Sequence, residues 1–105
     1  MKNKIKEVQK LCDYYNLNLR IQYYGDRQVC FLGVREDEEE VFCISIWYPR
    51  NERKMDLRIY SDKEDYRNFG AFGKEEILLM LSLDELTDDE LGIKPQKKEK
   101  ENERI

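Results

Sequence analysis

The sequence contains no histidine, so the commonest general base and the usual partner of a serine or cysteine nucleophile are missing. It also lacks a phosphate-binding loop, a dinucleotide-binding glycine pattern and a nucleophile elbow. Its 23 acidic residues are spread along the chain and single out no pair of carboxylates for acid and base chemistry. We therefore expect a protein that is not an enzyme and that has no catalytic residues and no cofactor.

Cysteine is scarce, and Cys12, Cys30 and Cys43 follow no metal-binding spacing. We expect three buried free thiols, and the reducing conditions that such thiols require predict a cytoplasmic protein. No metal site is expected, because residues 36–40 lack the spaced ligands and the central glycine of a calcium-binding loop. No secretory signal is apparent, and the longest apolar run is far shorter than the roughly 18 residues of a membrane span.

What the sequence does contain is a run of eight residues, VFCISIWY, of which seven are apolar or aromatic. The run is short, is rich in residues that favour strands and is followed by Pro49, whose missing N–H cannot continue a sheet ladder. We predict a central strand over 41–48. Phe42, Ile44, Ile46 and Tyr48 alternate there with Val41, Cys43, Ser45 and Trp47, and the pattern does not decide which set is buried.

The periodicities on either side predict the remaining elements. They are a helix over 4–15, strands over 17–24, 28–34 and 55–60, a helix over 74–82 and a short helix after a capping box that begins at Thr87. Residues 82–85 offer the same box in an earlier register, and Asn16 and Gly92 are the expected helix terminators. Connectors this short join antiparallel neighbours. The expected fold is α+β, a four-stranded antiparallel meander with an N-terminal helix and one or two C-terminal helices (α-β-β-β-β-α-α), the helices lying mainly on one face. The residues expected in the core are Tyr23, Phe31, Phe42, Ile44, Ile46, Leu57, Ile77 and Leu81, with Leu78 on the same helical stripe.

Charge is unevenly distributed along the chain. The net charge is −4, yet residues 11–93 hold ten basic and nineteen acidic residues, which amounts to −9. Both ends are basic: residues 1–10 hold four lysines and one glutamate, and residues 94–105 hold five basic and three acidic residues. We expect a single domain over 1–93 and a disordered charged tail over 94–105, because the tail has too few apolar residues to offset the cost of ordering.

Two clusters of acidic residues are candidate partner-binding sites. They comprise Glu36, Asp37, Glu38, Glu39 and Glu40 between two strands, and Asp84, Glu85, Asp88, Asp89 and Glu90 near the last helix. Carboxylates held on a rigid scaffold present negative charge much as a duplex presents phosphates. In size, acidity and element order the chain is similar to the small acidic inhibitors of phages and mobile elements, namely anti-restriction, anti-CRISPR and immunity proteins. That resemblance implies a non-enzymatic inhibitor that blocks a basic surface of a partner, such as a nucleic-acid-processing enzyme.

Other interpretations remain open. The acidic clusters serve equally well as solubilising surface, and Trp47, Tyr24 and Tyr60 are candidate aromatic anchors beside them. The alternative function is a nucleic-acid-binding domain that uses Arg20, Tyr24, Arg58 and Tyr60 on one face of the sheet. The acidic body argues against direct nucleic-acid binding. A homo-oligomer formed through an edge strand is a further alternative.

Deleting residues 96–105 should leave the melting temperature almost unchanged, because this polar segment offers no apolar face to pack. Thermal unfolding of the shortened and full chains, followed by circular dichroism, tests the expectation. A decrease of more than several degrees would show that the segment docks on the domain.

Overall fold

A computed structural model describes residues 3–60 and 72–95. The four strands pair antiparallel in the order β1-β2-β3-β4, and three short helical elements end the domain, so the predicted α+β meander is confirmed. The predicted tail, apart from Lys94 and Pro95, lies outside the described residues. The elements are α1 (Lys4–Tyr14), β1 (Asn18–Tyr23), β2 (Gln28–Val34), β3 (Glu40–Trp47), β4 (Lys54–Ile59), α2 (Lys74–Leu81), the 3-10 helix η2 (Ser82–Glu85) and α3 (Asp88–Leu91).

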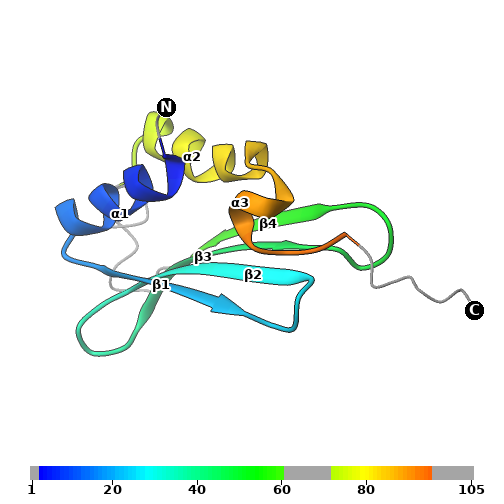
Figure 1. The fold of residues 1–105 in the computed structure, drawn as a ribbon. Helices are drawn as coiled ribbons and strands as arrows, with labels where there is room; N and C mark the ends of the chain where they lie inside the picture. The colour runs from blue at the N-terminus through cyan, green and yellow to red at the C-terminus, as the bar shows by residue number, and fades with distance from the viewer. Residues whose placement is uncertain (1–2, 61–71, 96–105) are drawn as a thin grey trace, which may run out of the picture.

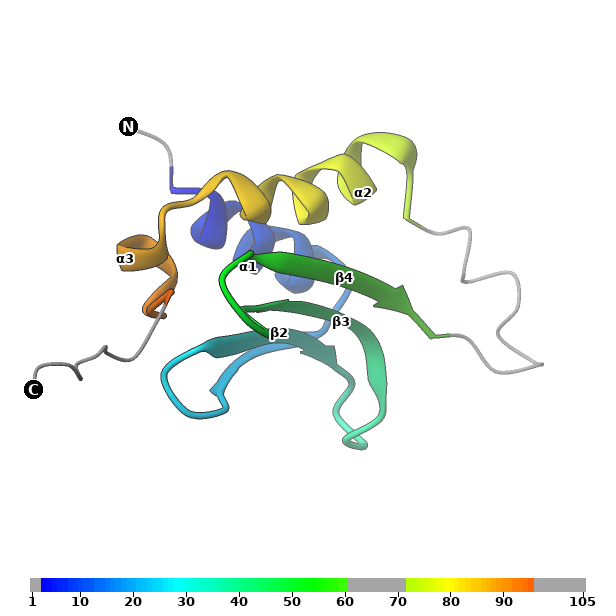
Figure 2. The same cartoon turned by 90° about the vertical axis from the view of Figure 1, so that its right-hand side faces the viewer.

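The helices form one layer and the twisted sheet forms another (Figures 1 and 2). α1, α2 and α3 lie over the same face of the sheet, while no described helix covers the opposite face. We call this uncovered side the open face. The edges of the sheet are β1 and β4, so a homo-oligomer of the kind considered above would use one of these two strands.

The helix layer buries one alternating set of β3 side chains. Phe42, Ile44 and Ile46 are fully buried, which decides the orientation that the sequence left undetermined. Phe31 on β2 lies opposite Ile44, and Gly33 lies opposite Phe42. A Cβ atom at Gly33 would stand 2.2 Å from the Phe42 ring, so only glycine leaves room for this aromatic side chain.

Three of the predicted core residues prove to be largely exposed. Tyr23 is 52% exposed because it ends an edge strand, where one flank has no neighbour, although its hydroxyl donates to the Leu91 carbonyl at 2.9 Å. Leu78 and Leu81 are 54% and 41% exposed, so the predicted stripe of α2 is wrong for these two residues, whereas Ile77 packs partly buried against the core. Residues 77–81 are apolar on every side of the helix, and packing on the sheet buries Met80 instead.

The local signals for helix ends are confirmed. Asn16 and Gly92 take the left-handed conformation, with φ of 60° and 79°. Thr87 and Glu90 form the capping box, in which each side chain accepts a backbone N–H of the other residue, at 3.1 and 2.8 Å. The alternative box at Ser82 is not used, since the Ser82 hydroxyl donates to the Leu79 carbonyl.

A polar contact joins α1 to α2. The Tyr15 hydroxyl beyond α1 donates to Glu76 of α2 at 2.8 Å. This hydrogen bond is the main reason that the pKa of Tyr15 is raised to about 12, and burial adds to it. The hydroxyl therefore stays protonated and holds α1 against α2 at neutral pH.

Replacing Ile46 by alanine should lower the free energy of unfolding by about 2–5 kcal/mol, because its side chain is fully buried in the centre of the sheet. Leu78→Ala is the matched control: it removes a similar side chain from an exposed helical position and should change stability by about 0.5 kcal/mol or less. Denaturant unfolding measures both. A loss below about half a kilocalorie for Ile46→Ala would contradict the central position of β3.

Candidate functional site

The open face carries the three aromatic residues that the sequence singled out. Side chains alternate between the two faces of a strand, so Trp47 on β3 points away from its buried neighbour Ile46. Tyr60 continues the open-face set of β4, and the Tyr24 hydroxyl donates to the open-face residue Gln22 at 2.9 Å. Arg20 and Arg58 belong to the same face, so the structure brings the predicted arginines and aromatic residues together.

A hollow of about 200 Å³ occupies the part of the open face formed by β2, β3 and β4. This volume is below the roughly 300–1,000 Å³ of pockets that take drug-sized ligands, so the hollow accommodates one ring or one side chain of a larger molecule. It contains a cation and a carboxylate, because Arg58 and Asp56 form an ion pair of 2.9 Å there. The lining residues are Gln28, Cys43, Ser45, Trp47, Asp56, Arg58 and Tyr60.

The Cys43 thiol and the Ser45 hydroxyl line the floor of the hollow, and Ser45 also contacts the thiol of Cys30. The Ser45 hydroxyl lies 3.3 Å from the Cys30 sulfur and 3.6 Å from the Cys43 sulfur. Burial is the main cause that raises the pKa of Cys43, so its thiol stays protonated and is a poor nucleophile. Within residues 3–60 and 72–95 no three metal-ligating side chains gather, and all three cysteines are free. The floor therefore offers weak hydrogen-bonding groups without a reactive centre.

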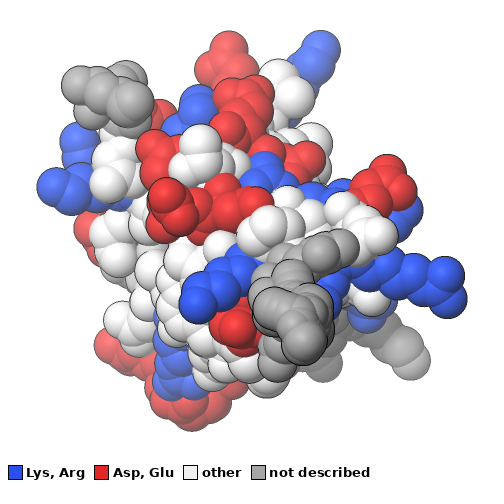
Figure 3. All heavy atoms as spheres, turned by 45° about the vertical axis from the view of Figure 1, so that its right-hand side comes forward, with Lys and Arg blue, Asp and Glu red and all other residues white. Residues whose placement is uncertain are grey.

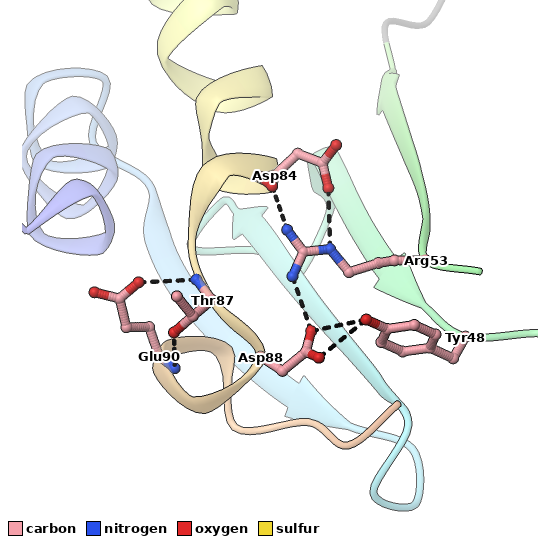
Figure 4. Close-up of polar contacts among 6 residues, drawn as sticks. All are labelled: Tyr48, Arg53, Asp84, Thr87, Asp88 and Glu90. Atoms are coloured by element: carbon pink, nitrogen blue, oxygen red, sulfur yellow. Dashed lines mark hydrogen bonds and ion pairs between the residues drawn. The ribbon is translucent and has the colours of Figure 1, made fainter. Parts of the chain in front are cut away.

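The second acidic cluster is tied to the sheet by Arg53, which follows β3 in the loop before β4 (Figure 4). Its guanidinium donates to the Asp84 carboxylate at 3.3 Å, to the Asp84 backbone carbonyl and to Asp88 at 2.9 Å. Asp88 also accepts the Tyr48 hydroxyl at 2.9 Å, and burial followed by this hydrogen bond raises the pKa of Tyr48. The Arg53 side chain is only 19% exposed, so these contacts fix η2 and α3 against the end of the sheet.

The remaining acids of this cluster face solvent on η2 and α3. Glu85 forms a long ion pair of 3.6 Å with Lys4, and Asp89 is exposed in the first turn of α3. Glu90 serves the capping box, but it too is exposed. Figure 3 shows acidic side chains gathered side by side over the helical layer. The cluster, which we call the acidic ridge (Asp84, Glu85, Asp88, Asp89 and Glu90), is therefore partly structural and partly free to meet a partner.

The first acidic cluster forms a tight turn between β2 and β3. Glu38 adopts φ of 73°, and its N–H donates to the Arg35 carbonyl at 2.9 Å. Arg20 pairs with Glu38 at 2.5 Å, and Arg35 pairs with Glu39 at 3.4 Å. The mutual repulsion expected of five adjacent carboxylates is thus already reduced by two arginines of the chain itself.

The two acidic clusters lie at opposite ends of the sheet. The β2–β3 turn is at one end, whereas the ridge packs near the β1–β2 and β3–β4 turns at the other (Figures 1 and 2). The Lys94 N–H donates to the Asp26 carbonyl at that second end, just beyond α3. The structure does not bring the clusters together, so a compact partner surface meets one of them or the other.

A comparison of the sequence with protein-family models gave no match, and comparisons with curated proteins and with solved structures found no significant relative. No described helix is long and apolar enough to cross a membrane.

Sequence reasoning missed Arg53 and the floor of the hollow. Arg53 lies in the polar loop PRNERK, and nothing in the local sequence distinguishes it from Arg50. Ser45 and Cys43 share a strand face with Trp47, so the alternation of β3 held a signal for them. The alternation identifies the residues of the hollow only after the structure has shown that the other set of β3 side chains is buried.

Replacing Arg53 by methionine should lower the free energy of unfolding by about 1.5–3 kcal/mol, because the partly buried Asp88 carboxylate and two oxygens of Asp84 lose their donor. Arg58→Met is the matched control, since the ion pair of Arg58 is exposed and its loss should change stability much less. Denaturant unfolding compares the two variants. Equal losses would show that the Arg53 contacts do not hold the acidic ridge in place.

Proposed function

We propose that the chain is a non-enzymatic protein-binding module that docks its acidic ridge on a basic surface of a partner and thereby inhibits that partner. The observation that carries the proposal is the anchored acidic surface of η2 and α3. The resemblance to small acidic inhibitors of phages and mobile elements supports the same function. A partner that processes nucleic acid fits this chemistry, because its substrate-binding surface is basic.

The ridge suits this role because it is held in place before any partner arrives. Arg53, Tyr48 and the capping box of α3 fix its backbone, so little conformational entropy is lost on binding. Arg53 and Lys4 are the cations paired with its five acids, so an excess of negative charge is left to attract a basic surface. Such an excess accelerates association by steering the partner at ordinary salt concentrations.

The β2–β3 turn is a weaker candidate for the same role. Two of its acids already pair with Arg20 and Arg35, and a basic partner would have to compete with both arginines. The turn is also a single connection between two strands, whereas the ridge is anchored by residues of the β3–β4 loop and of its own helix. We therefore place the main contact on the ridge.

Two charge-matched variants test this placement. Glu85→Gln with Asp89→Asn removes two charges from the ridge, while Glu36→Gln with Glu40→Gln removes two from the opposite end. Binding to an immobilised arginine-rich peptide, measured by surface plasmon resonance, should slow by about tenfold in association rate for the ridge variant alone. The two variants have the same net charge, so a difference between them reports location.

The outcomes separate the alternatives. Equal weakening of both variants would show attraction by net charge alone and would contradict a docking site on the ridge. Weakening of the Glu36 and Glu40 variant alone would move the interface to the β2–β3 turn. Cross-linking in native extracts with the wild-type chain and the ridge variant then identifies the partner as the protein lost only with the ridge variant.

A further inference from the structure

The open face is the basic side of an acidic molecule. Among the strand residues directed to it, three are basic and two are acidic, namely Arg20, Lys54 and Arg58 against Glu40 and Asp56. The chain as a whole has 23 acidic and 19 basic residues. A surface whose charge opposes that of the whole chain is complementary to an anionic ligand, and it repels the basic partner that suits the acidic ridge.

Aromatic side chains stand at both ends of the hollow on this face. Trp47 lies in the row that pairs with Lys54, and the Tyr60 N–H donates to the Val41 carbonyl at 2.7 Å. The two rows are six positions apart along β3, which corresponds to about 20 Å along the strand. Between them the hollow holds Arg58 and the polar floor, so ring-stacking positions and a cation alternate along one groove.

We propose that the open face binds single-stranded nucleic acid. Bases stack on Trp47 and Tyr60, since every base has a flat face and stacking needs no particular sequence. Arg58 contacts a phosphate between the two stacked bases, and Lys54 contacts a phosphate beside Trp47. A single strand fits and a duplex does not, because the bases of a duplex are stacked on one another and cannot reach the aromatic rings.

The acidic residues of the helix layer do not oppose this binding strongly. A helix with its side chains is about 10 Å thick, so the acids on its outer surface lie at least that far behind the open face. Charges separated by more than the screening length of roughly 8–10 Å interact weakly at ordinary salt. The long-range field of the chain therefore disfavours long polyanions while a short strand on the opposite face is little affected.

The local ion pairs are weak enough to be exchanged for phosphates. Arg58 is 69% exposed and its partner Asp56 is 45% exposed, at a distance of 2.9 Å. Lys54 meets Glu52 only at 3.8 Å, and both side chains are exposed. Exposed pairs of this kind are weak, so a phosphate replaces the carboxylate at little cost. Arg20 stays with Glu38 and is left out of the contact.

Trp47 is the sole tryptophan of the chain, so tryptophan fluorescence reports directly on the open face. Its fluorescence, followed during titration with short oligothymidine and oligouridine at about 50 mM salt, should show saturable quenching. With two phosphate contacts, the logarithm of the affinity should fall with the logarithm of the salt concentration with a slope of about −1.4. A duplex of the same length should leave the fluorescence unchanged.

Three variants assign the contacts. Tyr60→Ala should weaken binding about tenfold through the loss of one stacking position. Lys54→Gln with Arg58→Gln should bring the salt dependence close to zero. Tyr14→Ala is the matched control, because it removes an exposed tyrosine ring from α1 on the covered side of the sheet, and it should bind like the wild type.

Several results would overturn the proposal. They are an absence of quenching up to about millimolar oligonucleotide at low salt, equal binding of the duplex, and affinities that Tyr60→Ala leaves unchanged. Quenching by the arginine-rich peptide instead of the oligonucleotide would make the open face a protein interface. The ridge variant Glu85→Gln with Asp89→Asn should not alter the quenching, so this test and that of the proposed function fail or succeed independently.

Discussion

One-sided burial of β3 is the constraint on which the rest of the structure depends. Phe42, Ile44 and Ile46 are fully buried against the helix layer, and their neighbours on β2 and β4 follow the same register. Strand side chains alternate, so this choice directs Trp47, Ser45 and Cys43 to the other side. Since no described helix covers that side, the burial of one face of β3 creates the open face and its hollow.

A second set of contacts decides which acids are available. Arg53 holds Asp84 and Asp88, and Asp88 in turn accepts the Tyr48 hydroxyl, so two acids of the ridge have structural partners. These contacts fix η2 and α3 on the sheet and leave the remaining acids outward on a surface that does not need to reorganise. Residues that look equivalent in the sequence therefore divide into an anchoring set and an exposed set.

The two candidate surfaces differ in charge and face opposite ways. The ridge lies with the helix layer and is acidic, whereas the open face has more basic than acidic strand residues. The ridge belongs to the helix layer and the hollow lies on the face that no described helix covers, so the two ligands would approach from different sides. A module built this way can approach a basic protein with one side and a nucleic-acid strand with the other.

Much of the fold was determined by the sequence itself. The apolar run of β3, the capping box at Thr87 and the left-handed Asn16 and Gly92 are signals within a few residues, and the structure confirms them. The sequence did not determine which face of β3 is buried or which side of α2 is exposed. Both alternating sets of β3 are largely apolar, and residues 77–81 are apolar on every side of the helix. The candidate sites show the same division. The acidic residues were visible in the sequence, but the separation of their clusters and the roles of Arg53 and Ser45 arise from contacts between distant segments, and only the tertiary structure decides such contacts.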